Sequence, residues 1–491
     1  MNINRIEQFK IECEKVLRKY PLKALQSYAT TLEFRRPSDI KIDEIIPLII
    51  GALTGEIKPD GRVRVGRPSK NNSVPTELIA EIEALKRKYL YKENEIGLEE
   101  ANVDDFIAVP SKLVFSSDDI EEEHWTETIN KAVVRGQLQV LNEVSRLLPL
   151  DCGGEKEPIV VPAELVNKHG LREGDVIACH TVKSKNVSIV KEILTVNDTQ
   201  LMFLKREKFE ENEVCYPHKI VPFVSQNTAS ISAKYAEWIL PLYQGQRGLI
   251  LSSPKAGKTE LLYALAAATL KASQSVKVLA LLNAQSLESV WKFRKVVPED
   301  QLVYTTYEDV PEKQVFAAEF ILKRAKRLAE CGKNVVLFVD SLTALARAYN
   351  ETEESIGGKV LAGGLESKTL QYMRRFFSSA RCFKQGGSLT LLGTVACDTG
   401  NPFDELLSLD LSNLSNYQIC LSEALSARRV YPAIDLSKSF TCPGELGGGT
   451  ERVYQQVCHE ILPNRGEEAL CGMLESCDDY SAFLNEISVK K

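Results

Sequence analysis

The chain has 491 residues, of which 44% are hydrophobic and 26% charged, and this composition is typical of globular protein with a substantial core. No apolar run approaches the ~20 residues that cross a bilayer, and the amino terminus lacks the apolar core of a signal peptide. Twelve cysteines occur without any C-x-x-C pair, which favours buried thiols in a reducing cytoplasm over disulfides or a metal site. We therefore expect a cytoplasmic protein without a membrane segment. Its net charge of -6 restricts nucleic-acid binding to local basic patches.

The first hundred or so residues contain two kinds of segment. Residues 1–58 combine helical apolar spacing with polar breaks, which predicts a small helical module. Residues 59–105 form a basic linker followed by a helical pattern. The linker's Arg62, Arg64 and Arg67 leave two interpretations open: a solvated linker, which we favour, or an AT-hook that contacts DNA in a narrow minor groove.

The rest of the chain changes from a β-rich to an alternating pattern. Residues 106–200 contain short β-rich runs bounded by Gly, Pro, Asp or Asn, as in GDVIACHTV, which predicts a small antiparallel barrel. A connector of mixed character covers residues 201–245. Residues 246–491 alternate buried strand patterns with helical ones, which predicts a parallel sheet with helices on both faces. The expected fold class is multidomain α/β.

A nucleotide site is indicated by LILSSPKAGKT, a strand that passes through a loop into a helix. In such a P-loop the backbone N–H groups bind the phosphates, Lys258 neutralises the β/γ oxygens and Thr259 ligates Mg²⁺. The strict pattern has glycine where Ser252 stands. Further on, NVVLFVD ends at Asp340, in the form of a Walker B strand whose carboxylate holds Mg²⁺. The predicted nucleotide-binding residues of the loop are Pro254, Lys255, Ala256, Gly257, Lys258, Thr259 and Glu260.

At these residues the chain resembles the bacterial transcription termination factor Rho family. The blocks QRGLILSSPKAGKTELL, DSLTALARAYN, GGKVLAGGLESKTLQYMRRFF, GGSLTLLGTVACDTG and RRVYPAID keep the family's order and approximate spacing. PIVVPAELVNKHGLREGD is similar to the second half of the family's cold-shock (OB-like) barrel. The resemblance implies a RecA-like ATPase domain and a hexameric ring, formed alone or mixed with Rho. It also implies ATP-driven translocation and helicase activity on nascent RNA, which dislodges RNA polymerase.

The same resemblance assigns roles to individual residues. Tyr431 matches an aromatic residue that stacks on adenine, and Arg429 matches a nearby arginine. A second loop of the central pore has Pro402 where the family has a lysine. The pore loop that faces RNA is implied to comprise Lys359, Val360, Gly363 and Gly364.

Other functional positions of the family carry different residues here. The glutamate that polarises the attacking water aligns with Gln285, and a glutamine can hold a water but cannot accept its proton. The arginine finger of the neighbouring subunit aligns with Cys442, and Lys438 or Arg452 are candidate substitutes. The barrel's stacking aromatics align within NEVSRLL and at Val160, and losing such stacking removes about 1–3 kcal/mol per base. The catalytic positions implied are therefore Gln285, Arg429 and Cys442.

Three functions remain open at this point. The first is a working Rho-type terminator. The second is a paralogue that binds ATP and assembles but hydrolyses ATP slowly, acting as a regulatory or structural partner. The third is an ATPase-fold protein that contacts DNA through its basic linker. Family resemblance favours the first function, and the chemistry of Gln285 and Cys442 favours the second.

Overall fold

The structure is a computed structural model, and it describes residues 10, 12–31, 41–54, 129–140, 145–152, 159–184, 187–203, 206–225, 230–352, 359–442 and 448–489. The chain divides into two units, Met1–Ala108 and Val109–Lys491, which we describe separately. The basic linker with Arg62, Arg64 and Arg67 lies outside the described residues. Within the described residues, no helix has both the length and the apolar character that a membrane span requires.

The first unit contains a small helical core. Its named helices are α2 (Leu22–Thr31) and α3 (Ile42–Thr54), and α3 continues through Pro47. The apolar side chains recur three or four positions apart, so that one face of each helix is buried. The core consists of Cys13, Leu17, Leu25, Tyr28, Ala29, Ile45, Ile46, Ile49 and Ile50.

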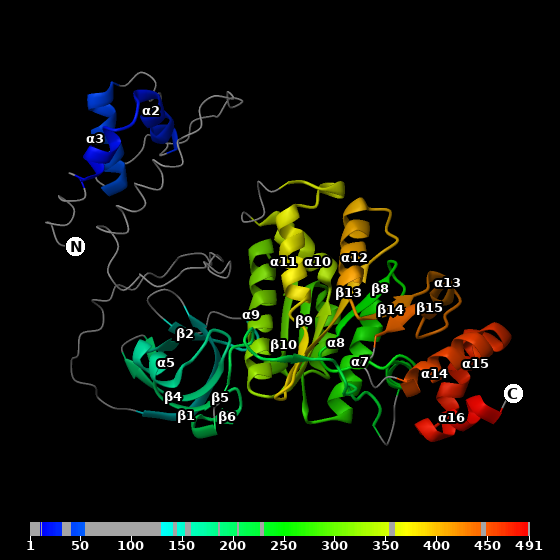
Figure 1. The fold of residues 1–491 in the computed structure, drawn as a ribbon. Helices are drawn as coiled ribbons and strands as arrows, with labels where there is room; N and C mark the ends of the chain where they lie inside the picture. Colours follow the sequence, from blue (N-terminus) through cyan, green and yellow to red (C-terminus); the bar gives the residue numbers. More distant parts are fainter. Residues whose placement is uncertain are drawn as a thin grey trace. The chain divides into compact units, whose positions relative to one another are not determined.

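The second unit begins with the expected barrel (Figure 1, cyan). Its strands follow the order β3-β2-β1-β4-β5-β6, and a pairing between β3 and β5 closes the sheet. Inward-facing apolar residues such as Leu138, Leu147 and Val161 fill the interior. The elements are β1 (Ile129–Val140), β2 (Ser145–Leu148), β3 (Ile159–Val161), α5 (Ala163–His169), β4 (Val176–Ser184), β5 (Val187–Val196), β6 (Thr199–Gln200) and η5 (Leu201–Phe203).

A larger sheet forms the centre of the second unit. Its strands follow the order β10-β9-β11-β13-β8-β14-β15, parallel from β10 to β14, while β15 is antiparallel. On a side branch, β12 pairs with β13, and β7 from the connector pairs with β12. The strands are β7 (Val214–Cys215), β8 (Arg247–Ser252), β9 (Val276–Gln285), β10 (Leu302–Thr306), β11 (Asn334–Asp340), β12 (Arg381–Phe383), β13 (Ser388–Ala396), β14 (Tyr417–Leu421) and β15 (Ile434–Thr441).

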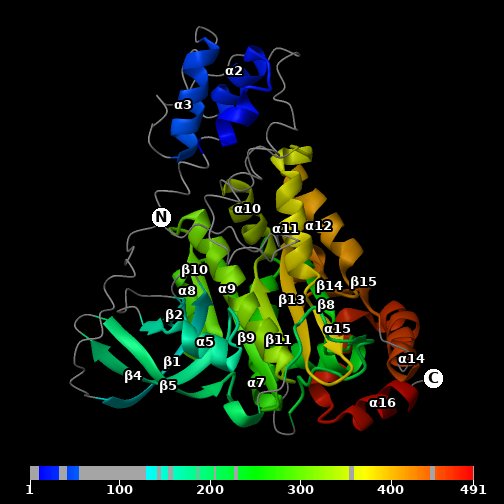
Figure 2. The ribbon, with the colours of Figure 1, turned by 60° about the vertical axis from the view of Figure 1, so that its left-hand side comes forward.

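Helices cover both faces of this sheet (Figure 2). Because crossovers between parallel strands are right-handed, the strand order places α7 and α8 on one face and α9 to α12 on the other. The helices are α7 (Lys258–Ala272), α8 (Leu287–Arg294), η7 (Glu299–Gln301), α9 (Pro311–Glu330), α10 (Leu342–Glu351), η8 (Ala362–Gly364), α11 (Ser367–Phe377), α12 (Pro402–Leu414) and α13 (Glu423–Ala427).

The carboxyl-terminal helices pack against a short helical segment that precedes β8. The Lys234 ammonium donates hydrogen bonds to the carbonyl oxygens of Leu474 (2.7 Å) and Cys477 (2.8 Å), and the Trp238 and Phe483 rings lie 5.5 Å apart. The two ends of the ATPase-fold region therefore share one core. These helices are α6 (Ile231–Lys234), the π-helical η6 (Tyr235–Ile239) and η9 (Val457–Ile461), α14 (Gly448–Gln456), α15 (Leu462–Ser476) and α16 (Tyr480–Val489).

A buried arginine joins the barrel to the large sheet's covering helix α9. Arg324 is 1% exposed, and its guanidinium donates to Gln137 Oε1 (2.7 Å), to the Asp300 carbonyl (2.8 Å) and to the Leu150 carbonyl. Gln137 in turn donates to the Phe320 carbonyl at 2.7 Å. The barrel is therefore docked through polar groups that are buried and satisfied.

Candidate functional site

The predicted P-loop connects β8 to α7. Gly257 caps the helix with φ 98°, a left-handed conformation that favours glycine, and Lys255 in the loop also has positive φ (66°). Ser252 is fully buried, and its hydroxyl donates to the Ser253 carbonyl at 2.6 Å. A small side chain therefore fits where the strict motif has glycine. The free N–H groups at the start of α7 form a site suited to phosphate.

Asp340 lies where the predicted Walker B residue should be. It is the last residue of β11, its side chain is fully buried, and Thr259 Oγ1 donates to its Oδ2 at 2.7 Å. Thr394 on the intervening strand β13 donates to Oδ1 at 2.6 Å. The structure thus brings Thr259 and Asp340 together although 81 residues separate them. A hydroxyl and a carboxylate in this arrangement are oxygen ligands of the kind that Mg²⁺ binds.

Gln285 ends β9, the strand next to β11. Its amide Nε2 lies 3.3 Å from the Asp340 carbonyl oxygen and 3.5 Å from that of Asn283. The preceding residue, Ala284, has φ 48°, and its N–H donates to Thr305 Oγ1 at 3.0 Å. Gln285 therefore sits beside the candidate metal site, at the place where a carboxylate could act as a general base.

Tyr431 lies beside the P-loop. A Cβ at Gly257 would be 3.6 Å from the Tyr431 ring, which is 53% exposed. The ring is therefore open to a flat partner such as adenine. Arg429, two residues earlier, is exposed with φ 60°, and its backbone N–H donates to the Ser426 carbonyl at 3.0 Å. Glu260, in the first turn of α7, forms an ion pair with Lys292 of α8.

Cys442 lies near the opposite end of the sheet from its own P-loop. It is exposed and follows β15 directly, where Thr441 pairs with Tyr417, and Tyr417 pairs with Gly248 near the start of β8. The P-loop follows the other end of β8. The candidate substitutes Lys438 and Arg452 are also exposed.

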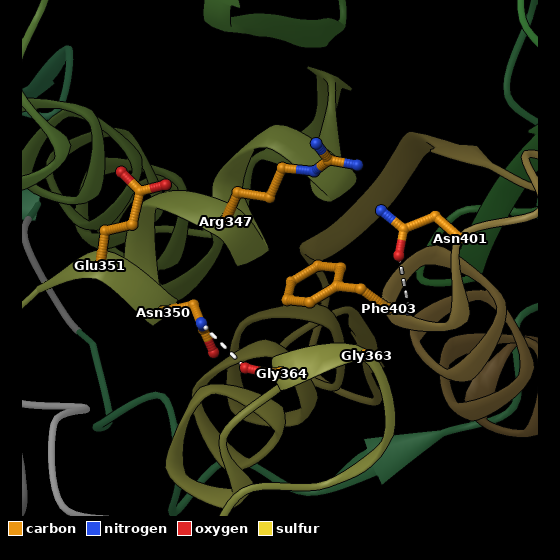
Figure 3. A pocket seen from close by; sticks show the side chains of 7 residues that line it. All are labelled: Arg347, Asn350, Glu351, Gly363, Gly364, Asn401 and Phe403. Atoms are coloured by element: carbon orange, nitrogen blue, oxygen red, sulfur yellow. Dashed lines mark hydrogen bonds between the residues drawn. The ribbon is translucent and has the colours of Figure 1, made fainter.

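The predicted RNA-facing loop is a tight turn held against a second loop (Figure 3). Lys359 and Val360 are exposed, Val360 pairs with Glu366, and Gly363 and Gly364 have φ 69° and 83°. A Cβ at Gly363 would lie 2.2 Å from the Phe403 backbone nitrogen, so only glycine allows this contact.

Helix α10 fastens both loops. Asn350 donates to the Gly364 carbonyl at 3.2 Å and accepts from the Glu366 N–H at 2.9 Å. Arg347 forms an ion pair with Asp404 at 2.8 Å in the first turn of α12. The residues around the resulting cavity of about 200 Å³ are Arg347, Asn350, Glu351, Gly363, Gly364, Asn401 and Phe403.

The barrel's register decides which residues of the segments aligned with the family's stacking aromatics share a face. Ser145 pairs with Val161 and Arg146 pairs with Val160, and residues that pair directly lie on the same face. Val161 faces the barrel core, so Ser145 shares the inner face while Val160 lies with Arg146 on the outer face. Ser145 and Val160 therefore lie on opposite faces and cannot form one stacking surface. The outer face carries Arg146, which donates to Gln139 Oε1 at 2.8 Å.

Several known proteins are similar to this chain. The ATP synthase alpha/beta family nucleotide-binding domain matches residues 233–441. "Transcription termination factor Rho" of Streptobacillus moniliformis is 33% identical over 315 residues, which span 63% of this chain and 74% of that protein. The protein of the same name from Streptosporangium roseum is 35% identical over 290 residues, 59% of this chain and 74% of its own. Among solved structures, the type III secretion ATPase EscN is similar with a TM-score of 0.45 and 20% identity, covering 62% of this chain and 72% of that one.

The parallel sheet, the P-loop after β8 and Asp340 at the end of β11 define a RecA-like P-loop ATPase-fold domain, which implies nucleotide binding. Because the match to the Streptobacillus protein covers 74% of that protein at 33% identity, the chain belongs to the Rho family of transcription termination factors. The expected fold class is confirmed, including the closed barrel that precedes the ATPase-fold domain.

Proposed function

We propose that this chain is a Rho-type transcription termination factor that uses ATP and Mg²⁺ to translocate along nascent RNA and displace RNA polymerase. The observation that carries the proposal is the hydrogen bond from Thr259 to Asp340, which assembles both halves of the metal site. Lys258 begins α7 beside them, and Tyr431 borders the P-loop with an exposed ring. These groups supply the contacts that a triphosphate, its metal and its base need.

The arrangement of the remaining residues supports a ring, either a homohexamer or a mixed ring with Rho. Cys442 lies at the end of an edge strand, away from its own P-loop, where it can approach a neighbouring nucleotide. Lys359 and Val360 are exposed on the loop that faces RNA in the proposed pore. ATP bound between subunits would then move this loop, because α10 connects it to the strand that ends at Asp340.

A second candidate is a Rho-family protein that binds ATP and assembles but turns ATP over slowly. Gln285 favours it, because an amide beside the Asp340 carbonyl can hold a water without accepting its proton. Cys442 cannot stabilise transition-state charge as an arginine does. The comparisons favour the terminator, and the DNA-contact alternative rests on arginines outside the described residues.

The test is phosphate release by the full-length protein, measured with and without poly-pyrimidine RNA, alongside transcript release from stalled RNA polymerase. The terminator predicts RNA-stimulated turnover and ATP-dependent release of transcripts. The second candidate predicts tight ATP binding with neither activity. If the protein binds no nucleotide, both functions are wrong.

A further inference from the structure

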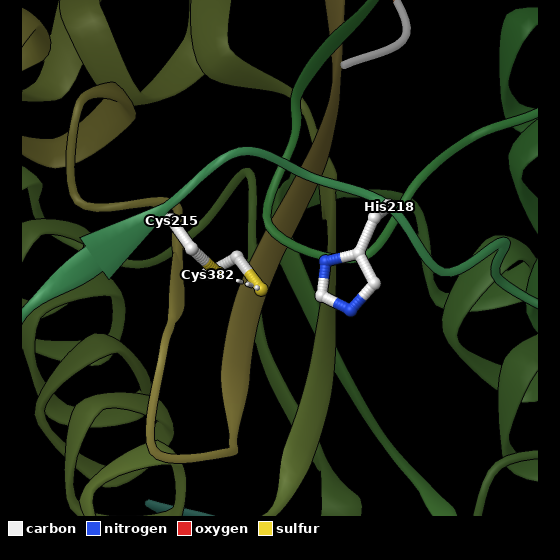
Figure 4. Close-up of side chains that lie close together, drawn as sticks. All are labelled: Cys215, His218 and Cys382. Atoms are coloured by element: carbon white, nitrogen blue, oxygen red, sulfur yellow. Dashed lines mark hydrogen bonds between the residues drawn. The ribbon is translucent and has the colours of Figure 1, made fainter. Parts of the chain in front are cut away.

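Three potential metal ligands meet where the connector joins the large sheet (Figure 4). Cys215 of β7 and Cys382 of β12 are direct partners in an antiparallel pair, and their Sγ atoms lie 3.3 Å apart. His218 follows Cys215 by three residues, and the three ligand atoms all lie within 4.8 Å of one another. This cluster was not expected from the sequence, where scattered cysteines favoured isolated buried thiols.

The surrounding backbone holds these side chains in place. A Cβ at Gly245 would lie 2.6 Å from the Cys382 nitrogen, so the chain just before β8 packs directly on this cysteine. The Lys384 N–H donates to the Glu213 carbonyl at 2.9 Å and extends the pairing of β7 with β12. His218 Nδ1 lies 3.1 Å from the Tyr216 carbonyl oxygen, a hydrogen bond that keeps the imidazole beside the thiols. The backbone therefore holds the three candidate metal-ligating side chains close to one another.

The donor set selects the kind of ion. Two thiolates and an imidazole suit Zn²⁺ and other borderline-soft cations, whereas Mg²⁺ and Ca²⁺ require oxygen ligands. With Zn–S bonds of about 2.3 Å, two tetrahedral thiolates stand roughly 3.8 Å apart, so the present spacing needs to open only slightly. His218 is exposed, which leaves water as the fourth ligand.

A reactive cysteine is a poor alternative explanation. Reactive cysteines are accessible to solvent, whereas Cys382 is buried at 7% exposed. A disulfide between Cys215 and Cys382 would use the same two sulfurs. Alkylation followed by mass spectrometry distinguishes a disulfide from metal binding.

We propose that Cys215, His218 and Cys382 form a zinc site with one water-filled position, which fastens the connector to β12 on the side branch of the large sheet. The connector leads along the chain from the barrel to β8. The ion would therefore stabilise the segment that links the barrel to the ATPase-fold domain. The site is separate from Thr259 and Asp340 and uses no nucleotide. Failure of the proposed terminator activity therefore leaves it untouched.

The test measures metal in full-length protein purified under reducing conditions without chelator. We expect about one zinc per chain by elemental analysis, and a Co²⁺-loaded protein with thiolate-to-cobalt charge-transfer and tetrahedral d–d absorption. Cys215→Ser and His218→Gln should each lower the zinc content at least about tenfold. Cys458→Ser changes a half-buried cysteine outside the cluster and should leave the metal content unchanged.

A second measurement links the ion to the fold. Chelator should lower the melting temperature of the wild-type protein, added Zn²⁺ should restore it, and Cys215→Ser should respond to neither. Cys215 and His218 are less buried than Cys382, so these variants keep the test valid even if Cys382→Ser does not fold. The proposal is overturned if Co²⁺ shows no thiolate charge transfer, if the variants bind metal like the wild type, or if rapid alkylation and mass spectrometry find Cys215 and Cys382 disulfide-bonded.

Discussion

Thr259 lies in the first turn of α7 and Asp340 ends β11, and the hydroxyl of the first donates to the carboxylate of the second at 2.7 Å. Thr394 occupies the other carboxylate oxygen at 2.6 Å, so the fully buried Asp340 has a partner on each side. Thr259 and Asp340 are the residues that would hold Mg²⁺: the Thr259 hydroxyl would supply an oxygen lone pair, and the Asp340 carboxylate would coordinate the ion or accept hydrogen bonds from its waters. These two candidate ligands are therefore held together by the protein's own hydrogen bonds.

Removing either charge at this site should abolish ATP binding. Lys258→Ala deletes the cation that faces the β/γ oxygens, and Asp340→Asn removes the charge that holds the metal, so affinity should fall by about two orders of magnitude or more. Lys271→Ala, in the last turn of the same helix, should bind like the wild type. Equilibrium dialysis with labelled ATP measures this. Tight binding by folded Lys258→Ala protein would show that the P-loop assignment is wrong.

Restoring the family's catalytic groups should speed hydrolysis without tightening ATP binding. Gln285→Glu supplies a carboxylate beside the Asp340 carbonyl, and Cys442→Arg supplies a cation to the neighbouring subunit. Both groups act on the transition state, so the double variant should exceed either single variant in kcat by about tenfold or more, with KM little changed. Steady-state phosphate release measures the effect. Wild-type turnover of several per second with RNA would contradict the slow-hydrolysis candidate.

The barrel should bind pyrimidine-rich RNA weakly, because its outer face has Arg146 and Val160 where stacking aromatics would be needed. Arg146→Tyr with Val160→Phe should tighten RNA binding, by about 1–3 kcal/mol for each base that stacks. Ser145→Phe is the matched control: its side chain faces the core, so it should destabilise the protein by about 1–3 kcal/mol without tightening binding. Fluorescence anisotropy and thermal melting separate the two effects. Stronger binding by Ser145→Phe alone would contradict the register.

Replacing Arg324 should loosen the barrel from α9. Arg324→Leu leaves Gln137 Oε1 and the Asp300 and Leu150 carbonyl oxygens without their donor, at a cost of about 1–3 kcal/mol for each group that remains buried. We expect a lower melting temperature and faster hydrogen exchange in β1 and α9. Lys313→Ala, at an exposed position of the same helix, should change neither. Unaltered exchange in Arg324→Leu would mean that the barrel does not depend on this contact.

The nucleotide site could be predicted from sequence because its parts are local signals: a strand, a loop ending in Gly257-Lys258-Thr259, and a second strand ending in an acid. The outer face of the barrel could not be predicted from sequence. Successive side chains of a strand point to opposite faces, so an alignment error of one residue exchanges the inner and outer faces. Contacts between distant segments left no local pattern either. Arg324 is 187 residues from Gln137, and Cys382 is 167 residues from Cys215.

Helix α10 starts two residues after Asp340. Its later residues Arg347 and Asn350 contact Asp404 in the first turn of α12 and Gly364 in the predicted RNA-facing loop. Ten helical residues make a rod about 15 Å long, with every backbone bond satisfied along its middle. Such a rod resists compression, so any movement of the β11 tip would be passed along α10 to the loop that contains Lys359. One end of α10 therefore adjoins the candidate magnesium ligand Asp340, and its other end holds two loops that can move only together.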